Sequence, residues 1–139
     1  MSEAIEFLKK GQVFKAQTVK GGYSFLYCRG VQQTDGLVHF IQSGVDKRAG
    51  REGRVRCYKL QPQQVLRMIN GGDLEPISKD SVDWERFEGA SLAASAMAKG
   101  ISLDDYIEGR MTGEITPDGG ESDLMPTEIP RIMREPSGE

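Results

Sequence analysis

The sequence predicts an α+β protein. We expect a small antiparallel β-sheet or partly open barrel of four to five strands, a short N-terminal helix, a C-terminal helical hairpin and a disordered tail. Short runs that alternate apolar and polar residues fill the first 60 residues, with glycine-rich or polar turns between them, which is typical of antiparallel strands. Farther along the chain, an alanine-rich segment and a segment with a capping serine have the composition and spacing of helices. Residues 112–139 are rich in proline, glycine and acidic residues, which is typical of a disordered tail.

Five segments are predicted to be strands. The Gly21-Gly22 dipeptide suits a two-residue hairpin because glycine reaches positive φ without strain, and Asp35-Gly36 is a second hairpin signal. Ser43–Gly53 holds three glycines and three basic residues, so we expect it to be a mobile surface loop. The predicted strands are Val13–Val19, Tyr23–Arg29, Leu37–Gln42, Arg54–Leu60 and a brief edge strand, Leu74–Ile77.

Four segments are predicted to be helices. Pro62 suits a first helical turn, and Gly71-Gly72 ends that helix. Ser102, with an acid three residues later, caps the last helix. The helices are Glu3–Lys10, the segment from Pro62 to Gly71, Ala90–Lys99 and the segment after Ser102. Residues 1–111 form one globular domain, and residues 112–139 form a flexible acidic tail.

The last two helices weakly resemble a helix-turn-helix or a ribbon-helix-helix unit. Asp104 and Asp105 would open the second helix, where they would repel phosphate, so a helical hairpin for packing or oligomerisation is the better interpretation. Trp84 and exposed methionines favour self-association, and we expect a homo-oligomer.

Charge is unevenly distributed along the chain. Residues 1–70 carry 12 Lys or Arg against 5 acids, a net charge of +7, whereas residues 71–139 carry 6 against 16, a net charge of −10. This asymmetry favours a polyanion-binding body joined to an acidic tail, and a chance distribution over a solvated surface is the alternative.

The sequence contains no recognisable motif for catalysis, a cofactor or a metal. His39 has no serine or cysteine partner fixed by spacing, so we expect no enzyme, no cofactor and no metal site. Cys28 and Cys57 are interpreted as buried thiols rather than a disulfide. No segment has the length of a membrane span and the N-terminus lacks a secretory signal, so we expect a cytoplasmic protein without a membrane partner.

The strand Tyr23–Arg29 alternates aromatic and apolar side chains. One face carries Tyr23, Phe25, Tyr27 and Arg29, and the other carries Ser24, Leu26 and Cys28. If the latter face points to the core, the outer face displays rings and a guanidinium group. In the alternative, Tyr23 and Phe25 lie in the core and Leu26 lies outside.

The strand Arg54–Leu60 repeats the pattern, with Arg54, Arg56 and Tyr58 opposite Val55 and Cys57. Unpaired bases stack on aromatic rings at about 1–3 kcal/mol each, and Arg and Lys contact phosphates, so this pattern favours single-stranded nucleic acid. The basic loop before this strand could close over the bound chain. The predicted nucleic-acid-binding residues are Lys20, Tyr23, Tyr27, Arg29, Lys47, Arg48, Arg51, Arg54, Arg56 and Tyr58.

This layout of a basic, aromatic, β-rich body and an acidic tail resembles small single-stranded-DNA-binding proteins of bacteriophages, including the Drc-type transcription regulators of lytic podophages. The resemblance covers the whole chain in layout, length and charge. It implies cooperative binding of single-stranded DNA, homo-oligomerisation, and support of viral replication or transcription in the host cytoplasm. The tail is expected to compete for the basic face, and a polymerase is its candidate partner.

Two other functions fit the same features. The acidic half could mimic nucleic acid, which would make the chain a protein-binding inhibitor of a host enzyme. The same arginines and tyrosines could instead bind a small nucleotide ligand.

Overall fold

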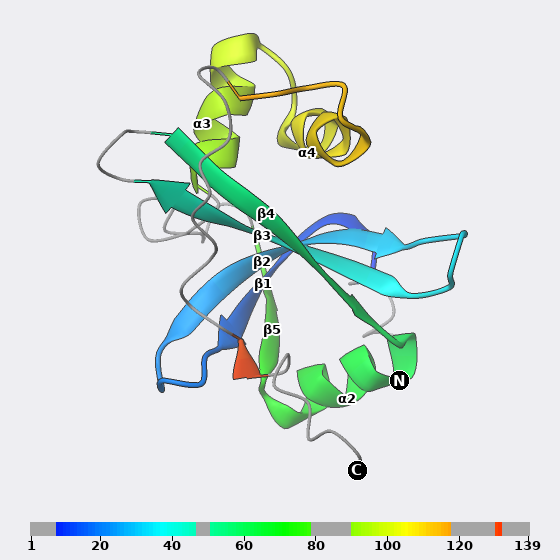
Figure 1. The fold of residues 1–139 in the computed structure, drawn as a ribbon. Coiled ribbons are helices and arrows are strands. Elements are labelled where there is room, and N and C mark those ends of the chain that lie inside the picture. Colours follow the sequence, from blue (N-terminus) through cyan, green and yellow to red (C-terminus); the bar gives the residue numbers. More distant parts are fainter. Residues whose placement is uncertain (1–7, 47–50, 79–89, 118–129, 132–139) are drawn as a thin grey trace.

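The computed structural model describes residues 8–46, 51–78, 90–117 and 130–131. Five antiparallel strands form one open, strongly twisted sheet in the order β4-β3-β2-β1-β5, so β4 and β5 are its edges (Figure 1). The α+β class and the open sheet are therefore confirmed. The strands are β1 (Lys10–Gln17), β2 (Tyr23–Val31), β3 (Val38–Asp46), β4 (Arg51–Leu60) and β5 (Leu74–Ile77).

Three helices accompany the sheet: α2 (Pro62–Gly71), α3 (Ala90–Lys99) and α4 (Leu103–Thr112). Pro62 lies in the first turn of α2, and Gly72 ends this helix in a left-handed conformation with φ 88°. The Ser102 hydroxyl accepts a hydrogen bond of 3.0 Å from the Asp105 N–H, which confirms the predicted cap of α4. None of these helices is long and apolar enough to cross a membrane.

The turn between β1 and β2 is longer than the two-residue turn expected at Gly21-Gly22. The last strand pair is Gln17 with Tyr23, and the Thr18 N–H donates to the Gly22 carbonyl at 3.0 Å. Gly21 has φ 95°, so the turn still needs the glycine that marked it.

One face of the sheet, here called the α2 face, packs against α2. Phe14, Leu26 and Phe40 are fully buried there with Val65 of the helix. The Phe14 and Phe40 rings meet edge to face, with centroids 5.5 Å apart. Among the described residues, this face holds the larger core. Burying each of these large side chains contributes about 1.5–3 kcal/mol to stability.

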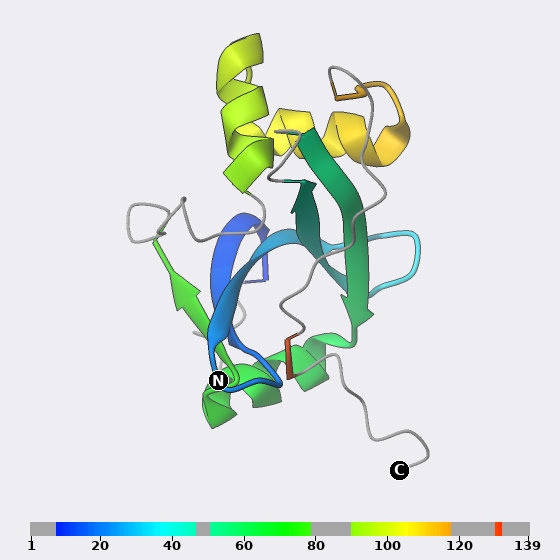
Figure 2. The ribbon, with the colours of Figure 1, turned by 60° about the vertical axis from the view of Figure 1, so that its left-hand side comes forward.

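The opposite face, here called the hairpin face, packs against α3 and α4. Tyr27 and Ile41 of the sheet are buried with Ala96 of α3 and with Tyr106 and Ile107 of α4. Figure 2 shows this helical hairpin and α2 on opposite sides of the sheet. The sheet is thus covered on both faces by helices, α2 coming between β4 and β5 in the chain and α3 and α4 coming after β5.

The prediction of a mobile loop at Ser43–Gly53 is wrong for most of that segment. Strand β3 continues to Asp46 and β4 begins at Arg51, and these two residues pair beyond a bulge. Because backbone N–H and carbonyl groups pair whatever the side chains are, a glycine-rich segment can extend an antiparallel ladder. Residues 47–50 lie outside the described residues.

The structure also differs from the predictions of an N-terminal helix and of a flexible C-terminal tail. Lys10 begins β1 rather than ending a helix, and residues 3–7 of the predicted Glu3–Lys10 helix lie outside the described residues. In the predicted tail, Ile115 packs against the hairpin cluster and its N–H donates to the Gly109 carbonyl at 3.0 Å. Pro130 forms an isolated bridge with Thr18 of the β1–β2 turn. Trp84 and most of the acidic tail lie outside the described residues.

Candidate functional site

Strand register places the predicted binding residues on two different faces. Across the sheet, Tyr27 pairs with Ile41 and Ile41 with Cys57, so Tyr27 and Cys57 both lie on the hairpin face. Tyr58 instead pairs with Phe40 on the α2 face. The prediction of one common aromatic and basic face is therefore wrong. Alternation shows which residues of a strand share a face, but the register between strands decides which sets meet.

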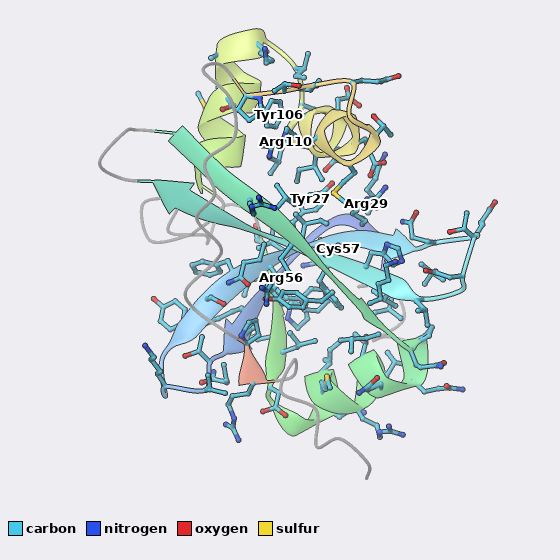
Figure 3. All side chains as sticks on the ribbon, viewed as in Figure 1. Tyr27, Arg29, Arg56, Cys57, Tyr106 and Arg110 are labelled. Carbon is cyan, nitrogen blue, oxygen red and sulfur yellow. The ribbon has the colours of Figure 1, made fainter. Side chains whose placement is uncertain are left out.

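Tyr27 is buried under α4, so its predicted place on an exposed face is also wrong. Only 1% of Tyr27 is exposed, and its hydroxyl donates a hydrogen bond to the Asp104 carboxylate. Burial, and then the Asp104 hydrogen bond, raise the pKa of Tyr27 far above its ordinary value. Figure 3 shows Tyr106 and Arg110 on α4 above Tyr27, which leaves no room for a base to stack on that ring.

Arg29 is already neutralised by α4. Its Nε and Nη2 donate to the two carboxylate oxygens of Glu108, both at 2.8 Å, and its side chain is 13% exposed. The Glu108 hydrogen bonds raise the pKa of Arg29, and the same bonds lower the pKa of Glu108. In this structure the guanidinium group serves the docking of α4 rather than an outer surface.

Arg54, Arg56 and Tyr58 stay together as a row on the edge strand, here called the β4 stripe. Arg54 is exposed, and Arg56 and Tyr58 are half-buried. The Arg56 guanidinium carbon lies 6.0 Å from the centre of the Tyr58 ring, within the range of a cation–π contact. The Tyr58 hydroxyl donates to the side-chain carbonyl of Gln42 at 2.8 Å, which anchors the ring beside the α2-face core.

Lys20 and Tyr23 belong to a second basic and aromatic group at the β1–β2 hairpin. Lys20 is exposed in the turn, and the Lys15 ammonium lies 4.4 Å from the centre of the half-buried Tyr23 ring. Phe25 packs edge to face on Tyr23 and is 4% exposed, as the alternative interpretation expected for Phe25. Lys47 and Arg48 lie outside the described residues, and Arg51 is described only in its backbone, paired with Asp46.

A thiol, an imidazole and a carboxylate meet on the hairpin face, where β3 and β4 pair. The His39 Nε2 lies 2.9 Å from the Asp35 Oδ2, and the His39 Nδ1 lies 3.6 Å from the Cys57 Sγ. Asp35 is held by its turn, because its Oδ1 accepts from the Leu37 N–H at 2.9 Å. That hydrogen bond, and then His39, lower the pKa of the Asp35 carboxyl group.

His39 therefore has a cysteine partner in the folded sheet, although no motif spacing in the sequence fixed one. His39 and Cys57 are 18 residues apart in the sequence but nearly opposite in the sheet, since Ile41 pairs with Cys57. The only sequence signal was that the two predicted strands follow one another in a meander. Burial raises the pKa of the half-buried Cys57 thiol, while the nearby Arg29 and Lys59 charges act in the opposite direction.

The described residues hold no group of three or more His, Cys, Asp or Glu side chains arranged to bind a metal ion. Comparison of the chain with protein-family models, with curated proteins and with solved structures finds no match. Among the described residues, the β4 stripe and the Asp35–His39–Cys57 group are the two candidate sites.

Proposed function

We propose that the protein binds single-stranded DNA without sequence preference, through the β4 stripe of Arg54, Arg56 and Tyr58. The observation that carries this proposal is the Arg56 guanidinium over the Tyr58 ring on an edge strand. A ring and two guanidinium groups in one row match the alternation of bases and phosphates along a single strand.

The stripe suits a single strand better than a duplex. Duplex DNA buries its base faces in stacking, whereas an unpaired base can stack on a tyrosine ring beside an arginine. Strand β4 is at the edge of the sheet, so an extended chain can approach it from the open side. The Gln42 hydrogen bond holds the Tyr58 ring in place before binding, which lowers the entropic cost of ordering it.

The structure changes which of the predicted residues carry this proposal. Tyr27 and Arg29 are no longer assigned to the DNA-binding surface, because both side chains are hydrogen-bonded to α4. Lys20 and Tyr23 form a second, independent contact region at the β1–β2 hairpin. Arg51, Lys47 and Arg48 continue the chain from the β4 stripe, and we assign phosphate contacts to them on sequence position alone.

The wider role follows from the layout of the chain. We propose that the protein acts as a homo-oligomer in the cytoplasm, supporting phage replication or transcription, with the acidic tail competing for the basic surface and contacting a polymerase. Met97 is 81% exposed on α3 and offers an apolar contact for self-association.

Fluorescence anisotropy with labelled single-stranded and duplex oligonucleotides, titrated over a salt series, tests the proposal. We expect single-stranded binding that weakens steeply with salt and a much weaker duplex signal, because phosphate contacts release counterions. Equal binding to both would remove the stacking argument. Absence of binding at low salt would overturn the proposal in favour of the protein-binding inhibitor, which capture of a protein partner from host lysate would then test.

A further inference from the structure

We propose that Cys57, His39 and Asp35 form a base-assisted thiol that reduces small hydroperoxides and is converted to a sulfenic acid. This inference is independent of nucleic-acid binding. It starts from three side chains that the sheet brings together in a line: carboxylate, imidazole and thiol, with contacts of 2.9 Å and 3.6 Å. This order is the one in which a carboxylate orients an imidazole and the imidazole accepts a proton from a nucleophile.

The carboxylate sets the tautomer of the imidazole. Because Asp35 accepts a hydrogen bond at the His39 Nε2, the proton of the neutral ring lies on that nitrogen. The Nδ1 is then an acceptor, and it faces the Cys57 Sγ. His39 is 7% exposed, so the sheet restrains its ring in this orientation. Asp35 acts as a positioning residue, and His39 as the base.

The environment of the thiol makes the base necessary. Burial raises the pKa of Cys57, so little thiolate forms at neutral pH without help. Lys59, and Arg29 even though it is paired with Glu108, nevertheless place positive charge near the sulfur, where it stabilises negative charge that develops during reaction, while the Asp35 carboxylate acts in the opposite direction. Figure 3 shows Cys57 on β4 and Arg29 on the same side of the sheet, below α4.

The proposed step balances without any further reactant. The Cys57 Sγ attacks one peroxide oxygen as its proton moves to the His39 Nδ1; an S–O bond forms and the O–O bond breaks. The sulfur loses two electrons and becomes a sulfenic acid, while the peroxide is reduced. The departing alkoxide or hydroxide takes the proton back from His39 and leaves as an alcohol or as water. A small hydroperoxide is the substrate class, because Cys57 is half-buried.

The fate of the sulfenic acid also follows from the fold. Cys28 is buried on the α2 face of β2, whereas Cys57 lies on the hairpin face of β4, with β3 between the two strands. Two strand spacings separate them by about 10 Å, which is too far for a disulfide. Burial raises the pKa of Cys28 to about 11, and its thiol serves as an unreactive internal control. Reduction of oxidised Cys57 therefore needs a thiol from outside the chain.

The first experiment treats the whole protein with hydrogen peroxide at pH 7 and traps sulfenic acid with dimedone. Digestion at glutamate separates the two cysteines for mass spectrometry, because Glu52 lies between them. We expect Cys57 to be oxidised at least about tenfold faster than N-acetylcysteine, and Cys28 to stay unlabelled. A Cys57 oxidation rate at or below that of N-acetylcysteine would overturn the proposal, because this slow rate is the one expected of a thiol that has a raised pKa and no base.

Two variants then test the roles of the partners. His39→Gln should lower the rate at pH 7 about tenfold or more and restore it at alkaline pH, where the thiol ionises unaided. Asp35→Asn keeps an acceptor for the Leu37 N–H, so the turn is preserved, and it should lower the rate several-fold with a changed pH profile. If the pH profile of His39→Gln matches that of the native protein, His39 is not the base and the proposal fails.

Discussion

Arg29 of β2 and Glu108 of α4 are 79 residues apart in sequence and form an ion pair with two hydrogen bonds of 2.8 Å. The Tyr27 hydroxyl donates to Asp104, which lies one turn earlier on α4. These polar contacts surround the apolar contact of Ile107 with the sheet and specify how α4 lies on it. The acidic half of the chain thus neutralises part of the basic half within the folded domain.

Glu108→Gln should destabilise the protein by about 2 kcal/mol at pH 7, because the partly buried Arg29 then loses its charged partner. The folded-state pKa of Glu108 is lowered, so its contribution is present above the ordinary carboxyl pKa and is lost as pH falls through the folded value. Urea unfolding between pH 3 and 7 measures both effects. Glu114→Gln, which changes an exposed acid beyond α4, is the matched control and should change neither quantity. An unchanged acid dependence in Glu108→Gln would contradict the assignment.

Tyr27→Phe should cost about 1–2 kcal/mol at pH 7, because the Asp104 carboxylate loses a buried donor. The folded-state pKa of Tyr27 is raised, so its contribution is present below the ordinary phenol pKa of about 10 and is lost as pH rises through the folded value. Stability measured from pH 8 to 11 should therefore decline less in the variant than in the native protein. Tyr23→Phe keeps the contacts of its ring with Lys15 and Phe25 and serves as control. Identical alkaline curves for Tyr27→Phe and the native chain would exclude this account.

Gly109→Ala should destabilise the protein by about 1–3 kcal/mol although alanine favours helices, because the new methyl group collides with Ile115. Even the Ile115 Cβ lies 3.1 Å from the position of the added carbon, and the Ile115 N–H is bonded to the Gly109 carbonyl. Gly71→Ala is the matched helical control: nothing lies within 4 Å of its added carbon, so it should stabilise by about 0.5–1 kcal/mol. Thermal unfolding of both variants gives the comparison. Stabilisation by both would show that Ile115 is not packed on α4 in solution.

Arg54→Gln and Arg56→Gln should each weaken single-stranded DNA binding and reduce the slope of log affinity against log salt by about 0.7, the value for one lost phosphate contact. Arg67→Gln removes an exposed arginine from α2 and should leave binding within about twofold. Anisotropy titrations over a salt series report both quantities. Equal losses in all three variants would indicate a diffuse charge effect rather than a site on β4.

Tyr58→Leu should lower the affinity for single-stranded DNA about tenfold through lost stacking, and Tyr58→Phe should retain most of it. The phenylalanine variant keeps the ring under Arg56 but loses the hydrogen bond to Gln42, so it separates stacking from anchoring. Tyr27→Phe should bind like the native chain, since Tyr27 is buried. If Tyr27→Phe alone lost single-stranded DNA binding, the interface would lie on the hairpin face instead of on β4.

Much of the fold was predictable because its signals are local. Alternation predicted the strands, and Pro62, Ser102 and the helix-ending glycines marked the helix boundaries, which depend on the backbone chemistry of a few neighbouring residues. The extension of β3 and β4 through Ser43–Gly53 was missed because that pairing joins backbone groups and leaves little trace in side-chain pattern. The row of Arg54, Arg56 and Tyr58 was predictable because it depends only on the alternation of side chains along one strand.

The sequence by itself determined the order of the five strands and of the three described helices, and which residues of each strand share a face. Only the tertiary structure decided that Tyr27 and Arg29 are covered by α4, and that His39 meets Cys57. The physical reason is that strand register and helix docking depend on contacts between segments distant in sequence, whereas alternation depends only on the pleat of one strand.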